Sequence, residues 1–217
     1  MLEKMGAFFD RRLDGYEEHQ LTQIEGAAEF YPFTAQCLPM SERAAILDLG
    51  CGTGLELNEY FGLNPSAKVT GIDLAPGMLR TLREKFPDKA LTLIEGSYFD
   101  VPFPGNRFDA AVSVESLHHF TKDEKIPLYR KLYGSLKEEG YFILTDYFAA
   151  SDEDEMKFRE ALERLKKQEG IADDEFYHFD TPLTVAHETE ALRLAGFTVE
   201  ILKHWAATYT LKASKNP

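Results

Sequence analysis

The stretch from position 46 to position 54 determines the expected fold, and it is Ile46-Leu47-Asp48-Leu49-Gly50-Cys51-Gly52-Thr53-Gly54. Its apolar first half is typical of the end of a buried strand, and the residues from Leu55 to Phe61 are typical of the start of a helix. A strand that continues through a glycine turn into a helix directs backbone N–H groups at a nucleotide-like ligand. Glycine suits this turn because it adopts positive φ at little cost and lets the backbone approach a flat ligand closely.

The spacing of the glycines distinguishes between possible ligands. A dinucleotide fingerprint, G-x-G-x-x-G, needs a third glycine at position 55, which is Leu55 here. The glycines fall instead at Gly50, Gly52 and Gly54, after Asp48. This pattern resembles the first motif of the class I S-adenosylmethionine-dependent methyltransferases, and the alternative is a tight glycine turn in another α/β protein. The resemblance implies S-adenosyl-L-methionine as cofactor and an α/β, Rossmann-like fold. It also implies a seven-stranded, mostly parallel sheet with helices on both faces and its last strand antiparallel.

Length and composition are consistent with one domain, or with one domain and a modest insertion. The chain has 217 residues, and its 37 acidic residues outnumber its 24 lysines and arginines, so the net charge is −13. This excess argues against a nucleic-acid acceptor, because phosphate binding needs a basic surface. Cys37 and Cys51 are too few for a disulfide framework or a zinc site. Without an apolar signal core or a stretch of 18 apolar residues, we expect a cytoplasmic protein without a membrane span, either monomer or homodimer.

A second acidic residue is expected to contact the ribose of the cofactor. Lys68 to Asp73 is typical of a strand, and positions 50 and 73 are 23 residues apart, close to the spacing of a ribose-binding carboxylate. Each oxygen of the Asp73 carboxylate can accept a hydrogen bond from one hydroxyl of the diol. The alternative is an acid at a helix N-terminus, because Pro76 opens the next helix. Leu74 and Met78 follow and line either the adenine or the core.

The adenine itself is expected beside the next strand, Leu91 to Ile94. The residues that follow, Gly96, Ser97 and Tyr98, resemble the next motif of the family, although serine stands where an acidic residue is usual. The serine hydroxyl and the backbone N–H of Tyr98 can still bond to the adenine. The full set of predicted cofactor-binding residues is Tyr16, Asp48, Gly50, Cys51, Gly52, Asp73, Leu74, Met78, Gly96, Ser97, Tyr98 and Val114.

Candidate catalytic residues follow the fourth and fifth predicted strands. The run Phe108 to Val114 is apolar, as expected of a strand buried on both faces, and it continues through Glu115 to Phe120 in a sequence that resembles the family's fourth motif. Ligands bind outside the carboxyl ends of such strands, so the residues from Val114 to His119 are expected to line the site. The catalytic residue is not determined by the sequence, and the candidates are His119, His118, Tyr147, Asp146 and His178. Proximity of Asp146 and His119 would indicate a metal or an acid/base pair, but no ligand spacing is strong enough to predict a metal.

The chain divides into four predicted segments. Residues 1–40 resemble the helical lid of the family, in which Phe9, Leu13 and Tyr16 share one helix face and the tyrosine either reaches the methionine end of the cofactor or only packs. Residues 41–148 form the cofactor-binding core, including a helix from Asp123 to Leu136 that is capped by Gly140. Residues 149–181 are an insertion that caps the substrate pocket or forms a surface helix or a dimer contact. Residues 182–217 supply the closing helix and strands.

These expectations indicate a methyltransferase acting on a small-molecule acceptor. Because the sulfonium group is intrinsically reactive, positioning and exclusion of water can supply much of the rate. Two alternatives stay open. One is a non-catalytic module or sensor that binds S-adenosylmethionine or S-adenosylhomocysteine. The other is a nicotinamide-dependent reductase, which Leu55 disfavours.

Overall fold

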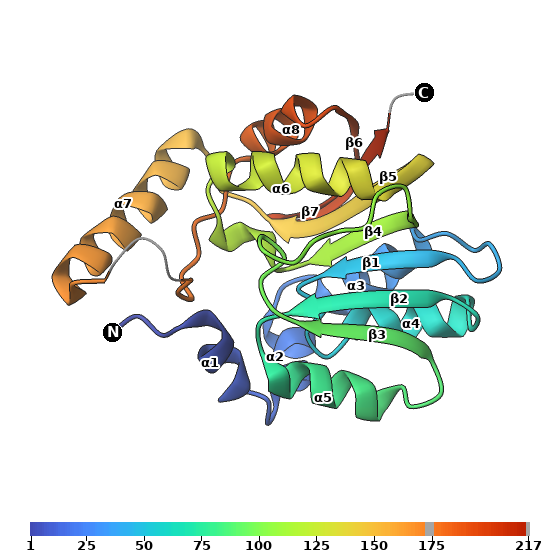
Figure 1. Cartoon of the computed structure of the whole chain (residues 1–217). Helices are drawn as coiled ribbons and strands as arrows, with labels where there is room; N and C mark the ends of the chain where they lie inside the picture. The colour runs from blue at the N-terminus through green and yellow to red at the C-terminus, as the bar shows by residue number, and fades with distance from the viewer. Residues whose placement is uncertain (172–175, 216–217) are drawn as a thin grey trace.

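The computed structural model describes residues 1–171 and 176–215 (Figure 1). Its helices are α1 (Met5–Asp10), α2 (Tyr16–Gln23), α3 (Ala27–Gln36), α4 (Leu55–Leu63), α5 (Pro76–Lys85), α6 (Lys122–Ser135), α7 (Asp152–Glu169) and α8 (Val185–Leu194), with a 3-10 turn η1 at Leu117–His119. Its strands are β1 (Ala45–Leu49), β2 (Lys68–Asp73), β3 (Ala90–Glu95), β4 (Phe108–Val114), β5 (Leu136–Tyr147), β6 (Phe197–Trp205) and β7 (Thr208–Lys215).

The seven strands form one sheet in the order β3-β2-β1-β4-β5-β7-β6. The first five strands along this order are parallel, and β7 runs antiparallel to both of its neighbours. This arrangement confirms the predicted Rossmann-like sheet with an antiparallel last strand. The order reverses at β1 and β4, and in such sheets ligands bind at that point, outside the carboxyl ends of the strands.

Hydrophobic side chains fill both faces of the sheet. Along β1, Ile46 packs in the cluster that includes α3 and α4, while Leu47 packs in the cluster that includes α6 and α8. Both side chains are fully buried, which explains why the strand sequence is apolar at consecutive positions. Figure 1 shows α6 and α8 together on one side of the sheet and α3 and α4 on the other.

The end of α6 differs from its prediction. Gly140 does not cap this helix, because α6 ends at Ser135 and β5 begins at once with Leu136. The early start of β5 has a long-range cause, since Leu136 pairs with Phe108 of β4. Helix α6 itself begins with a capping box, in which the Thr121 side chain accepts the Glu124 N–H and the Glu124 carboxylate accepts the Thr121 N–H.

The N-terminal segment also differs from its prediction. Phe9, Leu13 and Tyr16 do not lie on one helix, because α1 ends at Asp10 and α2 begins at Tyr16. Gly15 separates the two helices with a φ of 79°, a value that glycine adopts without strain. The single predicted helix is therefore two short helices joined at an angle by a glycine turn.

Helix α7 lies in the predicted insertion and extends over 18 residues from an N-cap at Ser151. In Figure 1 it projects away from the sheet on the side where the N-terminus lies. Parts of the predicted insertion (172–175) and of the predicted closing segment (216–217) lie outside the described residues. The division of the chain into four segments stays a prediction.

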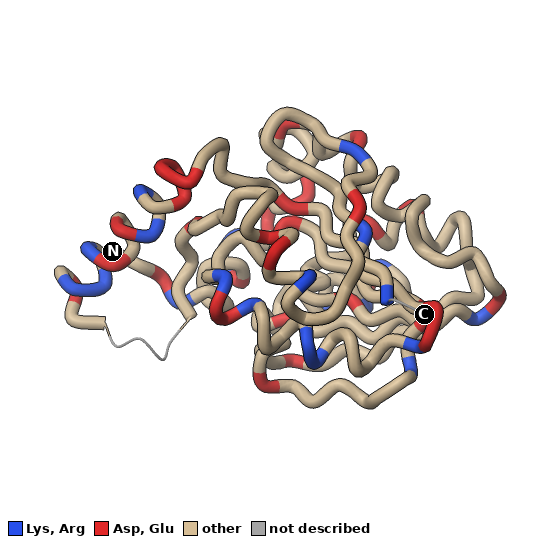
Figure 2. Tube along the Cα trace, turned by 90° about the horizontal axis from the view of Figure 1, so that it is seen from above, with Lys and Arg blue, Asp and Glu red and all other residues tan. Residues whose placement is uncertain are grey.

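Charged residues are distributed along the whole trace. In the view of Figure 2, acidic and basic positions are interspersed over the trace. None of the described helices has the length and the apolar character needed to cross a bilayer.

Candidate active site

The glycine turn joins β1 to α4 at the carboxyl edge of the sheet. Gly50, Gly52 and Gly54 have φ values of 72°, 48° and 71°, which are strained for residues with a Cβ. A Cβ on Gly50 would lie 2.0 Å from Ser116 Oγ, whereas a Cβ on Gly52 would meet no atom closer than the Tyr16 hydroxyl oxygen at 3.9 Å. Packing therefore requires the glycine at position 50, and the glycine at position 52 keeps open the space beneath Tyr16.

Buried polar atoms without a hydrogen-bond partner gather around this turn. Among the described residues they include Asp48 Oδ2, Thr53 Oγ1 and Glu56 Oε1. Burial raises the pKa of both carboxyl groups, and a hydrogen bond links them, so the pair retains a proton at pH values where exposed acids are ionised. The methionine part of S-adenosylmethionine carries an ammonium and a carboxylate that would supply partners to such atoms. The polar groups at this turn therefore fit the cofactor that the motif implies.

Asp73 ends β2 directly beside the glycine turn. One of its carboxylate oxygens accepts the Gly52 N–H and the other accepts the Ala75 N–H, each at 2.8 Å. The second contact is the helix-start role that the sequence left open, because Ala75 is the N-cap of α5. Each oxygen keeps a further lone pair that can accept a ribose hydroxyl. The ribose role of Asp73 stays a prediction.

The residues predicted to surround the adenine make contacts within the protein. Met78 is fully buried, which matches the core alternative. Ser97 Oγ accepts the Phe99 N–H at 3.1 Å, and the Tyr98 hydroxyl donates to the Ser116 carbonyl at 3.1 Å. These contacts order the loop after β3, and whether its groups also meet the adenine stays a prediction.

The N-terminal helices cover this part of the site. A Cβ on Gly6 of α1 would lie 2.8 Å from the Leu74 carbonyl oxygen, and Asp10 Oδ1 accepts the Gly77 N–H at 2.8 Å. The space that remains at the glycine turn, lined by Tyr16, Gly52 and Val114 among others, is about 10 Å³. This is room for about one water molecule. The N-terminal helices therefore form a close cover over this part of the site, and Tyr16 of α2 lies against the glycine turn.

A larger cavity of about 740 Å³ lies between this cover and the carboxyl ends of β4 and β5. Tyr16 borders both this cavity and the space at the glycine turn. The polar part of the cavity wall includes Glu115, His118, His119, Tyr147, His178 and Asp180. Four of the five catalytic candidates from the sequence are thus brought to one cavity, and the fifth, Asp146, lies directly behind it.

His118 is held by a buried carboxylate. Its Nδ1 donates to Asp146 Oδ1 at 2.5 Å, and Asp146 Oδ2 accepts the Leu117 N–H at 2.8 Å. Burial lowers the pKa of His118, but Asp146, Asp180 and Glu115 outweigh this effect and raise it to about 10. The ring is therefore an imidazolium near neutral pH.

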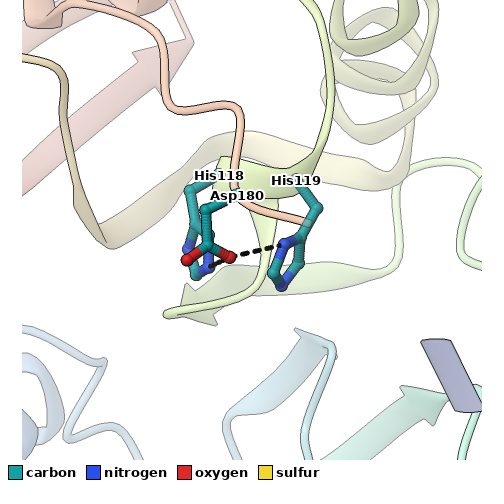
Figure 3. Close-up of side chains that lie close together, drawn as sticks. All are labelled: His118, His119 and Asp180. Carbon is teal, nitrogen blue, oxygen red and sulfur yellow. Dashed lines mark ion pairs between the residues drawn. The ribbon is translucent and has the colours of Figure 1, made fainter. Parts of the chain in front are cut away.

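His119 adjoins Asp180, a residue that the sequence did not single out (Figure 3). Its Nδ1 lies 3.2 Å from Asp180 Oδ1 and 3.2 Å from the Phe179 carbonyl oxygen. Burial and the neighbouring His118 lower the pKa of His119 to about 4, so this ring is neutral near pH 7. Burial tends to raise the pKa of Asp180, but its hydrogen bonds to both histidines hold it well below the ordinary range.

Glu115 lies in the segment that the sequence predicted to line the site, although it was not singled out there as a functional candidate. It has a φ of 50°, which is unusual for a residue with a side chain, and it follows the last residue of β4. Its backbone N–H bonds to the Thr145 carbonyl oxygen at 2.8 Å, while its side chain lines the cavity. Burial, followed by the nearby Asp146, raises the pKa of Glu115 to about 8. A strained backbone at the end of a parallel strand is a feature of functional sites, but it cannot be seen in the sequence.

Comparison with known proteins supports the family that the sequence resembles. A model of the methyltransferase domain matches residues 46–140. An uncharacterized methyltransferase of Geobacillus sp. (strain WCH70) is 25% identical over 217 residues, which cover 99% of this chain and 96% of the relative. These matches support a class I S-adenosylmethionine-dependent methyltransferase, the family that the glycine motif resembles. The cofactor that this family implies is S-adenosylmethionine.

Two further relatives show how widely this methyltransferase fold is shared. The phosphoethanolamine N-methyltransferase of Plasmodium falciparum is 28% identical over 134 residues, which cover 59% of this chain and about half (49%) of that protein. A putative methyltransferase in a complex with the Haloferax volcanii Trm112 methyltransferase activator superposes with a TM-score of 0.70 at 19% identity, covering 99% of this chain and 96% of that chain. The second likeness concerns the fold alone.

For this methyltransferase, the structure brings most of the predicted cofactor residues to one edge of the sheet. Gly50, Cys51 and Val114 line the space at the glycine turn together with Tyr16. Gly96 is hydrogen-bonded to the backbone of Asp73, since its N–H donates to the Asp73 carbonyl oxygen at 2.9 Å. Their contacts with the cofactor stay predictions, as do the roles of the catalytic candidates.

Proposed function

We propose that this methyltransferase transfers the methyl group of S-adenosylmethionine to a small molecule bound between the N-terminal helices and the ends of β4 and β5. The observation that carries the proposal is the cavity of about 740 Å³, bordered by Tyr16 on the side of the glycine turn. Pockets for small molecules typically have volumes of about 300–1,000 Å³. An acceptor held there would lie next to the methionine end of the cofactor, if Tyr16 meets that end as the family resemblance implies.

The polar wall of the cavity supports an acceptor with hydrogen-bonding groups. Near neutral pH it combines a cationic imidazole at His118, a neutral imidazole at His119 and a carboxylate at Asp180. Burial and Asp180 raise the pKa of Tyr147 far above neutrality, so its phenol is protonated. These groups would hold a hydroxyl or an amine in one orientation, which is the main requirement when the cofactor supplies an activated methyl group.

The charge of the chain supports a small acceptor over a nucleic acid. Acidic residues outnumber lysines and arginines by 37 to 24, and in Figure 2 the basic positions are interspersed with acidic ones. A phosphate backbone would need a concentrated basic surface.

The test is an acceptor screen with purified protein and S-adenosylmethionine. Small alcohols, amines, thiols and carboxylates are compared with bulk tRNA and a protein extract, and release of S-adenosylhomocysteine is measured for each. The proposal predicts turnover with at least one small-molecule class. Transfer to tRNA or protein alone would refute it, and cofactor binding without turnover on any acceptor would favour a non-catalytic binding module.

A further inference from the structure

We propose that His118, His119 and Asp180 form a binding site for a divalent transition-metal ion, with Zn²⁺ as the best match, in the wall of the acceptor cavity. The two histidines are consecutive residues of η1, and Asp180 lies near the end of the predicted insertion, between Phe176 and the start of α8. Figure 3 shows both imidazole rings turned toward the Asp180 carboxylate.

The distances between the three groups fit one shared ion. Asp180 Oδ1 lies 3.5 Å from His118 Nε2 and 3.2 Å from His119 Nδ1. One ligand atom from each residue lies within 4.8 Å of the other two. Tetrahedral ligands bound to Zn²⁺ at about 2.0–2.2 Å lie about 3.3–3.6 Å apart, so both distances from Asp180 are close to those between two ligands of one ion.

The surroundings of His118 are those of a metal-binding histidine. Its Nδ1 donates to Asp146 Oδ1 at 2.5 Å, and Asp146 is fixed in turn by the Leu117 N–H at 2.8 Å. A carboxylate behind one ring nitrogen fixes the ring and leaves the other nitrogen available to a metal, which is the usual arrangement around zinc. Here the available atom is Nε2, the one that faces Asp180.

The charge and the exposure of the cluster favour a cation that is reached from the cavity. Three acidic side chains, Glu115, Asp146 and Asp180, surround the two imidazoles. The side chains of His118 and His119 are 8% and 3% exposed, whereas that of Asp180 is 43% exposed. Two nitrogen ligands select zinc over magnesium or calcium, which prefer oxygen ligands. Three protein ligands leave a coordination position open toward the cavity.

The consequence for the acceptor rests on the proposed function. A hydroxyl oxygen that occupied the open position would have its pKa lowered by the ion, which would make it a better nucleophile near neutral pH. The favoured acceptor class is therefore a hydroxylated small molecule. In the metal-free arrangement the histidine N–H groups donate to Asp180, and an ion would displace these protons to solvent.

The experiment measures metal binding directly on the full chain. Protein treated with a chelator and then freed of it is titrated with ZnCl₂ by calorimetry, and with CoCl₂ while the visible absorption of bound Co²⁺ is followed. We expect one saturable site per chain. Asp180→Asn and His119→Gln should each weaken Zn²⁺ binding by at least about 10-fold and change the Co²⁺ spectrum.

His187→Gln is the matched control, because His187 belongs to a separate histidine–carboxylate group with Asp152 and Glu155. This variant should bind Zn²⁺ like the wild type. Thermal unfolding of each variant shows whether it is folded. Asp180→Asn is the substitution least expected to disturb folding, because the Asp180 side chain is more exposed than those of His118 and His119.

Two results would overturn the site: the absence of saturable Zn²⁺ binding, or binding that is unchanged in both Asp180→Asn and His119→Gln. In either case the imidazoles and acids form only a hydrogen-bonded network. The binding measurement does not depend on turnover. Zn²⁺ binding without methylation of any small molecule would refute the proposed function alone, and methylation by a protein that binds no Zn²⁺ would refute the metal site alone.

Discussion

Two alanine substitutions in the glycine turn should affect different properties of the protein. At Gly50 a methyl group would lie 2.0 Å from Ser116 Oγ, inside the folded protein. At Gly52 the nearest atom to a methyl group is the Tyr16 hydroxyl oxygen at 3.9 Å, so the protein itself has room for it. The space beneath Tyr16 is where the methionine part of the cofactor is predicted to bind. Gly50→Ala should therefore affect mainly stability, and Gly52→Ala mainly cofactor binding.

The magnitudes follow from backbone strain and overlap. Both positions have φ values in the left-handed region, which costs about 1–2 kcal/mol for alanine. The overlap with Ser116 adds about 1–3 kcal/mol at Gly50. A loss of 1 kcal/mol lowers the Tm by about 2–4 °C in a chain of this size. We therefore expect Gly52→Ala to lower the Tm by about 2–8 °C and Gly50→Ala to lower it further.

Thermal unfolding and calorimetric titration with S-adenosylmethionine measure the two effects separately. We expect Gly52→Ala to weaken cofactor binding by about 100-fold or more, equivalent to about 2.7 kcal/mol. Gly62→Ala in α4 is the control, because a Cβ there meets no atom within 4 Å; it should leave cofactor binding unchanged and the Tm unchanged or higher. The reasoning fails if Gly52→Ala binds the cofactor like the wild type, or if it is less stable than Gly50→Ala.

Three further predictions concern the buried acids, the contact between α6 and α8, and the cover. Burial raises the pKa of Glu56, so the folded state loses stability as the pH rises above 4.5, the ordinary pKa of a glutamate. Glu56→Gln removes this effect. In paired unfolding scans the variant should therefore be more stable than the wild type at about pH 8 but not at about pH 4. Lys125 Nζ donates to Glu188 at 2.5 Å in the core, so Lys125→Met should cost about 3–5 kcal/mol in urea unfolding. Adding Glu188→Leu should recover part of that loss, and a double variant less stable than the single one would contradict a buried ion pair. Tyr16→Phe should weaken cofactor binding by about 2- to 10-fold in calorimetry at an unchanged Tm, and an unchanged affinity would assign Tyr16 to packing alone.

The strands and helices of the cofactor-binding core, and the cofactor itself, could be predicted because the sequence signals for them are local. The stretch around Gly50, Gly52 and Gly54 combines a strand, a turn and a helix whose residues are neighbours in sequence. The spacing of the glycines, with Leu55 in place of the third glycine of a dinucleotide fingerprint, favoured this cofactor over a dinucleotide. The helix caps at Ser151 and Thr184 are likewise local features, since each side chain accepts an N–H three residues along the chain.

The errors arose where a second signal, distant in one case and local in the other, overrides helical spacing. Gly140 follows a helical pattern and is a typical cap, yet the chain has already entered the sheet, because Leu136 pairs with Phe108. Phe9 and Tyr16 have helical spacing, yet Gly15 divides the segment into two helices. In each case the sequence contains both signals, and only the packing decides between them.

By itself, the sequence determined the sheet, the family and the cofactor, because a strand–turn–helix motif folds from residues that are adjacent in the chain. The acceptor side was decided by tertiary structure alone. His118 and His119 meet Asp180 because the N-terminus holds the preceding segment in place: the Met5 N–H donates to the Phe176 carbonyl at 3.0 Å, and the His178 N–H donates to the Glu3 carbonyl at 2.9 Å. These partners are more than 170 positions apart in the sequence. Neither hydrophobic periodicity nor motif spacing indicates a contact between segments that come together only in the folded chain.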